Sequence, residues 1–97
     1  MFQLDFTLDA LGDLQLFRAY EQRQIISAIE TQLSYQPTQP TRNRKRLRPN
    51  VLAEWELRID HIRVFYDVDT ELSIVKIEAI GYKEGNMLFI HGEEYDL

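Results

Sequence analysis

The sequence centres on residues 55–66, Trp55-Glu56-Leu57-Arg58-Ile59-Asp60-His61-Ile62-Arg63-Val64-Phe65-Tyr66. Apolar and polar residues alternate on both sides of Asp60-His61, which is the period-two pattern of strands that bury one face. Aspartate and histidine tolerate the positive φ angles that a two-residue turn requires. The stretch therefore predicts a β-hairpin in which Trp55 faces Tyr66, Leu57 faces Val64 and Ile59 faces Ile62. Its other face carries Glu54, Glu56, Arg58, Arg63 and Asp67, and a charged face on a central hairpin is a candidate functional site.

The chain before the hairpin predicts one strand and two helices. Apolar and polar residues alternate over residues 2–7, as in a strand with one buried face. Thr7 or Asp9 can cap a short helix after this strand, because both side chains accept hydrogen bonds from the free N–H groups at a helix start. A second helix ends at Pro37, and its apolar stripe consists of Ile25, Ile26, Ile29 and Leu33. We expect the two helices to form a hairpin across one face of the sheet.

The chain after the second helix predicts a connector and further strands. Residues 36–50 contain all three prolines and predict an irregular connector. Residues 69–71 predict a turn, residues 72–80 a strand with Val75, Ile77 and Ala79 on one face, and residues 81–86 a polar loop. Residues 87–90 predict a last short strand, and an acidic tail follows. The order β-α-α-β-β-β-β is an α+β fold, in which the helical hairpin lies on an antiparallel sheet of about four to five strands.

The composition is that of one domain spanning residues 1–97. Cysteine is absent, which excludes disulfides and thiolate metal sites and is compatible with a reducing cytoplasm. No apolar run approaches the length of a membrane span, so we expect a cytoplasmic protein with no membrane partner. His61 and His91 lack the spacing of metal ligands, and we expect neither a metal nor a cofactor. His91 is interpreted as a surface residue or a proton shuttle.

Positive charge is concentrated in one segment of an acidic chain. The net charge is −5, yet five of the 11 basic residues fall within residues 42–48, namely Arg42, Arg44, Lys45, Arg46 and Arg48. The rest of the chain holds the other six basic residues against 16 acidic ones. Clustered cations favour contact with nucleic-acid phosphates. The alternative is a solvated loop that pairs with the acidic body.

This order of features resembles the RelE/ParE superfamily, the toxins of bacterial type II toxin–antitoxin modules. The resemblance rests on the hairpin with its Arg63-Val64-Phe65-Tyr66-Asp67-Val68 strand, on Lys45-Arg46-Leu47 before it, and on residues 75–81 after it. It covers nearly the whole chain. It implies the RelE/ParE-like fold, a cognate antitoxin as partner, and a toxin–antitoxin hetero-oligomer.

The resemblance also implies a candidate site. Ribosome-dependent RelE-like nucleases carry an arginine at the position of Arg63, where it meets the phosphate at the cleavage site. Lys83 falls where those enzymes have an important arginine. The implied reaction is cleavage of messenger RNA on the ribosome by attack of the ribose 2′-hydroxyl on its own phosphate, without a metal. Arg63 and Lys83 would stabilise the charged intermediate, and the basic run 42–48 would hold ribosomal RNA or message.

Several residues depart from the nuclease pattern and leave a second function open. Glu54 and Glu56 stand where RelE-like nucleases have lysines that meet RNA. Phe89 falls near the position of their catalytic tyrosine and has no hydroxyl to exchange a proton, so Tyr82 or Tyr95 would have to replace it. The alternative is a ParE-like inhibitor of another target such as gyrase, or a toxin fold without catalysis. In that case Arg63 forms a cross-strand ion pair with Glu56. We expect the C-terminal segment to cover Phe65.

Overall fold

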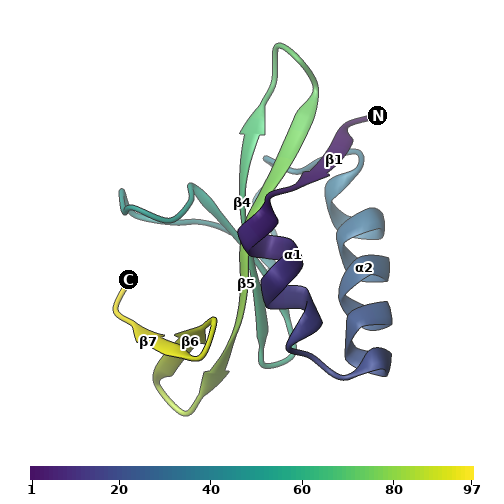
Figure 1. Ribbon diagram of the computed structural model, residues 1–97. Coiled ribbons are helices and arrows are strands. Elements are labelled where there is room, and N and C mark those ends of the chain that lie inside the picture. The colour runs from purple at the N-terminus through teal and green to yellow at the C-terminus, as the bar shows by residue number, and fades with distance from the viewer.

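The computed structural model describes residues 1–97 and has two layers, a helical hairpin on one face of a seven-stranded sheet (Figure 1). The elements are β1 (Gln3–Phe6), α1 (Leu8–Gln15), α2 (Ala19–Leu33), β2 (Arg44–Arg46), β3 (Trp55–Ile59), β4 (Ile62–Asp69), β5 (Ile74–Glu84), β6 (Met87–Ile90) and β7 (Glu93–Tyr95). This arrangement confirms the predicted α+β fold. The prediction lacked two short strands, because β2 lies in the expected connector and β7 in the expected acidic tail.

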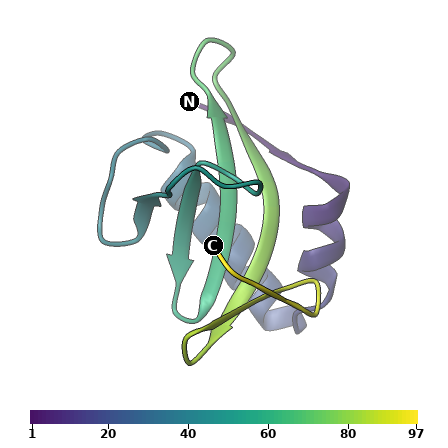
Figure 2. The same ribbon diagram turned by 90° about the vertical axis from the view of Figure 1, so that its left-hand side faces the viewer.

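The sheet has the strand order β2-β3-β4-β5-β6-β7, and each neighbouring pair is antiparallel (Figure 2). β1 is the exception, because it pairs with β5 in parallel. The expectation of four to five strands is therefore too small, because the sheet has seven. No helix of the structure is long and apolar enough to span a membrane.

The central hairpin has the predicted register. Trp55 pairs with Tyr66, Leu57 with Val64 and Ile59 with Ile62. Asp60 supplies the positive φ of the turn, at 53°. The Trp55 and Tyr66 rings stack with their centroids 6.2 Å apart. The Tyr66 hydroxyl donates to the Pro37 carbonyl at 2.6 Å and thereby ties the segment after α2 to the sheet.

A β-bulge in β5 changes which residues share a face. Phe65 pairs with Ala79 and Tyr66 with Ile77, so Glu78 is the extra residue on β5. Val75 and Ile77 therefore face the helices together with Ile80, whereas Ala79 faces the other side. The prediction that Ala79 shares a face with Val75 and Ile77 is wrong, because one inserted residue reverses the alternation that follows it.

β5 also continues beyond Gly81 to Glu84, so the polar loop predicted over residues 81–86 shrinks to the Gly85-Asn86 turn. Gly81 allows this continuation, because a Cβ there would collide with the Phe89 carbonyl oxygen of β6. The absence of a side chain thus lets β6 approach closely enough to pair with β5.

The cap of α1 and the buried stripe of α2 are largely those that the sequence predicts. Thr7 caps α1, and its hydroxyl accepts the Ala10 N–H at 3.0 Å. Ile25, Ile29 and Leu33 of α2 are buried against the sheet, whereas Ile26 is exposed. Burying each such side chain contributes roughly 1.5–3 kcal/mol. α2 ends at Leu33, just before the predicted stop at Pro37.

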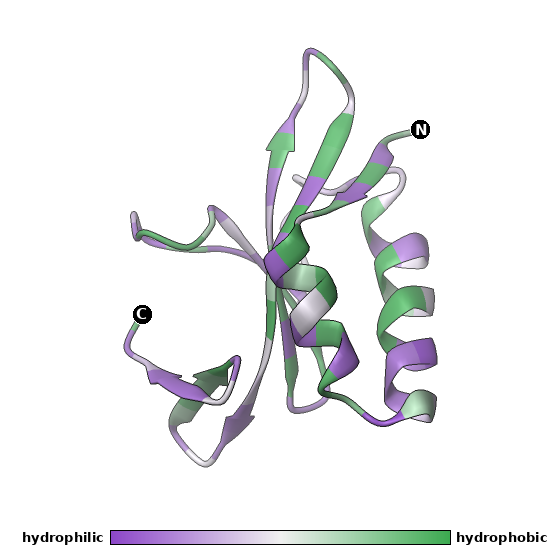
Figure 3. Cartoon of the chain, viewed as in Figure 1, coloured by the Kyte–Doolittle hydropathy of each residue, from purple (hydrophilic) through white to green (hydrophobic).

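A second apolar cluster lies on the face of the sheet away from the helices. It consists of Ala53, Phe65, Ala79, Leu88 and Ile90, with Leu47, Leu52 and Tyr95 packed against it. Figure 3 shows the alternation of apolar and hydrophilic residues along the strands that divides the two faces. The prediction that Phe65 is covered by the C-terminal segment is confirmed, because Leu88, Ile90 and Tyr95 belong to β6 and β7. We call this side of the sheet the open face.

Candidate functional site

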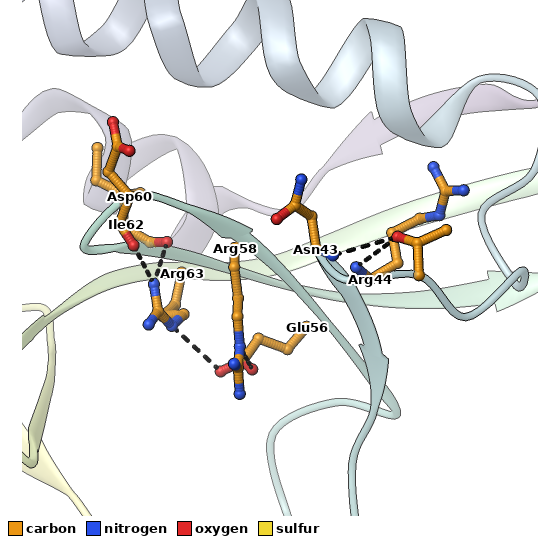
Figure 4. A network of polar contacts seen from close by, with 8 residues as sticks. Asn43, Arg44, Glu56, Arg58, Asp60, Ile62 and Arg63 are labelled. Atoms are coloured by element: carbon orange, nitrogen blue, oxygen red, sulfur yellow. Dashed lines mark hydrogen bonds and ion pairs between the residues drawn. The ribbon is translucent and has the colours of Figure 1, made fainter.

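Glu56 sits between two arginines on the open face (Figure 4). Its side chain is only 7% exposed, and its Oε2 accepts Arg58 Nε at 3.0 Å. Its Oε1 lies 3.7 Å from Arg63 Nε. The register sets Arg58 directly opposite Arg63, and two like charges in that arrangement destabilise a sheet. Glu56 therefore joins two strands that would otherwise repel each other here.

Arg63 is largely enclosed. Its side chain is 14% exposed, and Nη1 donates to the Asp60 carbonyl at 2.6 Å and the Ile62 carbonyl at 3.0 Å. The pKa of Arg63 lies below its ordinary value. Burial is the main cause, the neighbouring Arg58 charge adds to it, and the Glu56 carboxylate opposes it. The cross-strand ion pair with Glu56 is therefore present. Arg63 Nε is buried and has no hydrogen-bond partner, and the anion that it faces is the Glu56 carboxylate at 3.7 Å.

Two lysines share this face with the arginines. Lys45 on β2 pairs directly with Glu56. Gly81 on β5 pairs with Arg63, so Lys83 lies two residues further along the same face and is a diagonal neighbour of Arg63. We call this group the open-face cluster: Lys45, Glu56, Arg58, Arg63 and Lys83. It has four cations and one carboxylate, and so an excess of positive charge on an acidic protein.

The basic run 42–48 divides into buried and exposed members. Arg44 is 8% exposed, and its guanidinium donates to the Gln39 carbonyl at 3.0 Å and to the Gln32 carbonyl at 2.8 Å. It therefore fastens the connector to α2. Arg46 lies over the Trp55 ring, 5.8 Å from its centroid, and pairs with Glu54 at 3.2 Å. Arg42, Lys45 and Arg48 are exposed.

The aromatic residues near Phe89 lie on both faces. Phe89 stacks on Tyr82 at 5.4 Å, and Phe17 meets Tyr82 edge-on at 6.3 Å. Tyr82 pairs with Ile62, which puts its ring on the helical side and away from Arg63. Tyr95 pairs with Leu88, which in turn pairs with Lys83, so Tyr95 is the tyrosine that shares the open face. Two strand spacings separate them, so the backbones of Tyr95 and Lys83 are roughly 10 Å apart across the sheet.

The structure reveals a buried acid that the sequence reading did not single out. Asp13 on α1 is 2% exposed, and its Oδ2 accepts the Ile80 N–H at 3.0 Å. Its Oδ1 lies 2.9 Å from Nδ1 of His91, which has a φ of 55°. β1 pairs with β5 up to Ile77, and β6 pairs with it from Gly81, so Ile80 lies in the gap between these two strands. Asp13 accepts the Ile80 N–H in place of a strand carbonyl. The sequence carries no signal for this role, because an aspartate in a short helix is ordinarily exposed. His91 opens onto a cavity of about 400 Å³ that Arg18, His61 and Tyr82 also line.

Two carboxyls meet at the β-bulge. Burial raises the pKa of Glu78 to about 7, a hydrogen bond with Asp67 adds to this, and Lys76 opposes it. Lys76 Nζ lies 3.9 Å from Glu78. Asp67 also accepts the Glu54 N–H at 2.8 Å. Neither residue stands out in the sequence, because the bulge that brings them together arises from pairing between strands. No three His, Asp or Glu side chains are grouped so that they could hold a metal ion.

A helical hairpin packed on a sheet, with an arginine-bearing hairpin at its centre, is the arrangement that the resemblance to the RelE/ParE superfamily predicts. The chain belongs to the family described as the ParE toxin of the type II toxin–antitoxin system parDE, whose model matches residues 4–87. The fold is similar to a solved structure of the toxin–antitoxin complex RelBE2 from Mycobacterium tuberculosis, with 23% sequence identity and a TM-score of 0.73. That match covers 84% of this chain and 98% of the other. No curated protein matches the sequence.

Proposed function

We propose that this toxin acts by binding a protein target of the ParE type, such as DNA gyrase, and not by cutting messenger RNA. The observation that carries the proposal is the burial of Glu56 between Arg58 and Arg63. A nuclease of the RelE type presents cations to RNA on this strand. Here a carboxylate stands among the arginines, and a phosphate brought to the same place would have to compete with it for Arg58 and Arg63.

The surroundings of Arg63 support the same proposal. Its Nη1 is occupied by two backbone carbonyls of its own hairpin, which limits the two-pronged contact an arginine offers to a phosphate. Phe89 has no hydroxyl, and the ring of Tyr82 lies on the opposite side of the sheet. Loss of a proton-transferring group typically reduces a rate by 10²–10⁴-fold. We propose a cognate antitoxin as partner in a hetero-oligomer, and action in the cytoplasm.

The test compares two activities of the purified toxin. One assay follows supercoiling of a plasmid by gyrase, and the other follows cleavage of message bound to ribosomes. We expect inhibition of supercoiling and an intact message, and the complex with the antitoxin should be inactive as a control. Cleaved message together with unaffected supercoiling would overturn the proposal.

Message cleavage is the second candidate, and one observation favours it. Arg63 Nε is buried without a hydrogen-bond partner, and Lys83 lies on the same face. The two cations would stabilise the charge that develops on a phosphate. In that case Arg63→Ala abolishes cleavage while Arg58→Ala, which removes an equal charge from a more exposed position, retains it. Equal effects of the two variants would exclude Arg63 from that role.

A further inference from the structure

We propose that the cavity beside the turn from α1 to α2 binds the guanidinium group of an arginine side chain from a partner protein. This cavity of about 400 Å³ lies where α1 passes into α2 and β5 turns toward β6, at the bottom of Figure 1. Its volume is within the range of about 300–1,000 Å³ that is usual for ligand pockets. Neither Glu56 nor Arg63 lines it, so the site is independent of which target the toxin inhibits.

β5 supplies an aromatic wall with a carboxylate beside it. Tyr82 and Glu84 both line the cavity, and they are two residues apart on β5, so their side chains leave the same face of the strand. The Tyr82 ring is held by stacking on Phe89 at 5.4 Å and by the edge-on contact with Phe17 at 6.3 Å. A guanidinium group stacks on aromatic rings and pairs with carboxylates through its fork of N–H donors.

The charges around the cavity favour a cation. The ionisable groups that line it, the Tyr82 hydroxyl aside, are Asp13, Arg18, Glu21, His61, Glu84 and His91. Three carboxylates and one guanidinium leave a net charge of −2 while the two histidines are neutral. An arginine side chain from a partner would therefore enter with a favourable charge interaction.

Glu84 is the carboxylate that remains free for such a ligand. Asp13 already accepts the Ile80 N–H and lies 2.9 Å from His91 Nδ1. Glu21 accepts the Arg18 backbone N–H at 3.2 Å and lies 3.8 Å from His61. Glu84 takes part in none of the ion pairs within 4 Å.

The rim of the cavity indicates a protein as the source of the arginine. Leu16 lines the cavity and is 65% exposed, and Tyr20, between Arg18 and Glu21 in the sequence, is 57% exposed. Arginine and aromatic side chains are enriched at the centres of protein interfaces, where surrounding contacts exclude water. A small guanidinium compound would fill the cavity and leave the rim uncovered. A segment with apolar residues on both sides of its arginine would cover the rim as well.

The experiment titrates the isotope-labelled full chain with peptides near pH 8 and follows the backbone amides of Tyr82, Glu84 and His91 by NMR. The probes are the blocked tripeptide leucyl-arginyl-leucine, the same tripeptide with citrulline in place of arginine, and acetyl-arginine amide. Citrulline has nearly the same shape without the charge, so its tripeptide should bind about tenfold more weakly. Acetyl-arginine amide should also bind more weakly than the arginine tripeptide, because it leaves Leu16 uncovered.

Two matched pairs of substitutions locate the bound cation. Glu84→Gln should weaken binding of the arginine tripeptide about two- to fivefold, as expected for an exposed ion pair. Glu30→Gln removes the same charge from an exposed position on α2 and should have no effect. Arg18→Gln should tighten binding by a similar factor, because it removes the opposing charge from the cavity, whereas exposed Arg23→Gln should not.

Acidification gives an independent readout of the same site. His61 and His91 gain positive charge as the pH falls from 8 to 5, so binding of the arginine tripeptide should weaken over that range. Equal binding of the arginine and citrulline tripeptides would overturn the proposal, as would equal effects of Glu84→Gln and Glu30→Gln. Acetyl-arginine amide that binds as tightly as the tripeptide would exclude a protein partner. Inorganic phosphate is the last probe, and shifts of the three amides with phosphate but not with the arginine tripeptide would assign the cavity to anions.

Discussion

Replacing Glu56 with glutamine tests whether one carboxylate holds the centre of the sheet together. Glutamine has nearly the same shape, so the change removes the charge and little else. Three effects add: the hydrogen bond from Arg58 loses its anionic acceptor, the ion pair with Arg63 is lost, and the two opposed arginines repel each other. Hydrogen bonds to charged groups contribute about 1.5–3 kcal/mol, and removing one partner of a fully buried pair costs about 3–5 kcal/mol.

Glu56 and Arg63 are enclosed, whereas the Arg58 side chain is 41% exposed. The expected loss of unfolding free energy for Glu56→Gln therefore lies between the value for a charged hydrogen bond and the value for a fully buried pair. We expect about 2–3 kcal/mol. Glu54→Gln is the matched control. Its partner Arg46 and Glu54 itself are 62% and 56% exposed, so we expect a change below about 1 kcal/mol.

The assay is urea unfolding of wild type and both variants at low and high salt. Glu56→Gln should lower the midpoint without changing the slope, and removing Arg58 as well should recover part of the loss, since the opposed charges are then gone. Equal midpoints for Glu56→Gln and Glu54→Gln would refute the reasoning. So would a double variant without Arg58 that is less stable than Glu56→Gln.

Three further predictions concern stability. The raised pKa of Glu78, about 7, means that the folded protein holds this proton more tightly than the unfolded chain. The contribution is full at low pH and is lost as pH rises through 7, so unfolding free energy should fall by roughly 1–2 kcal/mol between pH 5 and 8, and Glu78→Gln should remove that fall. Arg44→Ala should cost about 2–4 kcal/mol in urea unfolding, whereas exposed Arg42→Ala should change it by less than about 0.5 kcal/mol. Asp13→Ala leaves the Ile80 N–H buried without an acceptor, so we expect a loss of about 1–3 kcal/mol and faster hydrogen exchange at Ile80.

Features that depend on neighbouring residues could be predicted from the sequence. The register of the hairpin follows from alternation on either side of a two-residue turn, since a slip by one residue would turn Trp55, Leu57 and Ile59 to solvent. The stripe of Ile25, Ile29 and Leu33 and the cap at Thr7 are equally local. Arg63 was predicted on the charged face and in reach of Glu56, because period two and the register together determine both.

Features that depend on distant partners appeared only in the tertiary structure. The bulge at Glu78 lies in the pairing of β5 with β4, a partner distant in the sequence, and no local pattern marks it. β2 and β7 are three-residue edge strands, too short to show an alternation. Asp13 looks like any helix-surface aspartate until β5 presents an unpaired N–H to it.

The basic run shows the same division within one segment. In the sequence Arg42, Arg44 and Arg48 are equivalent cations between Pro40 and Pro49. Packing separates them, because the carbonyl of Gln32 at the end of α2 lies within 2.8 Å of Arg44 and captures its guanidinium. Composition therefore determined that this stretch is positive. Which of its charges remain free to meet a ligand was decided by where α2 ends relative to the edge of the sheet.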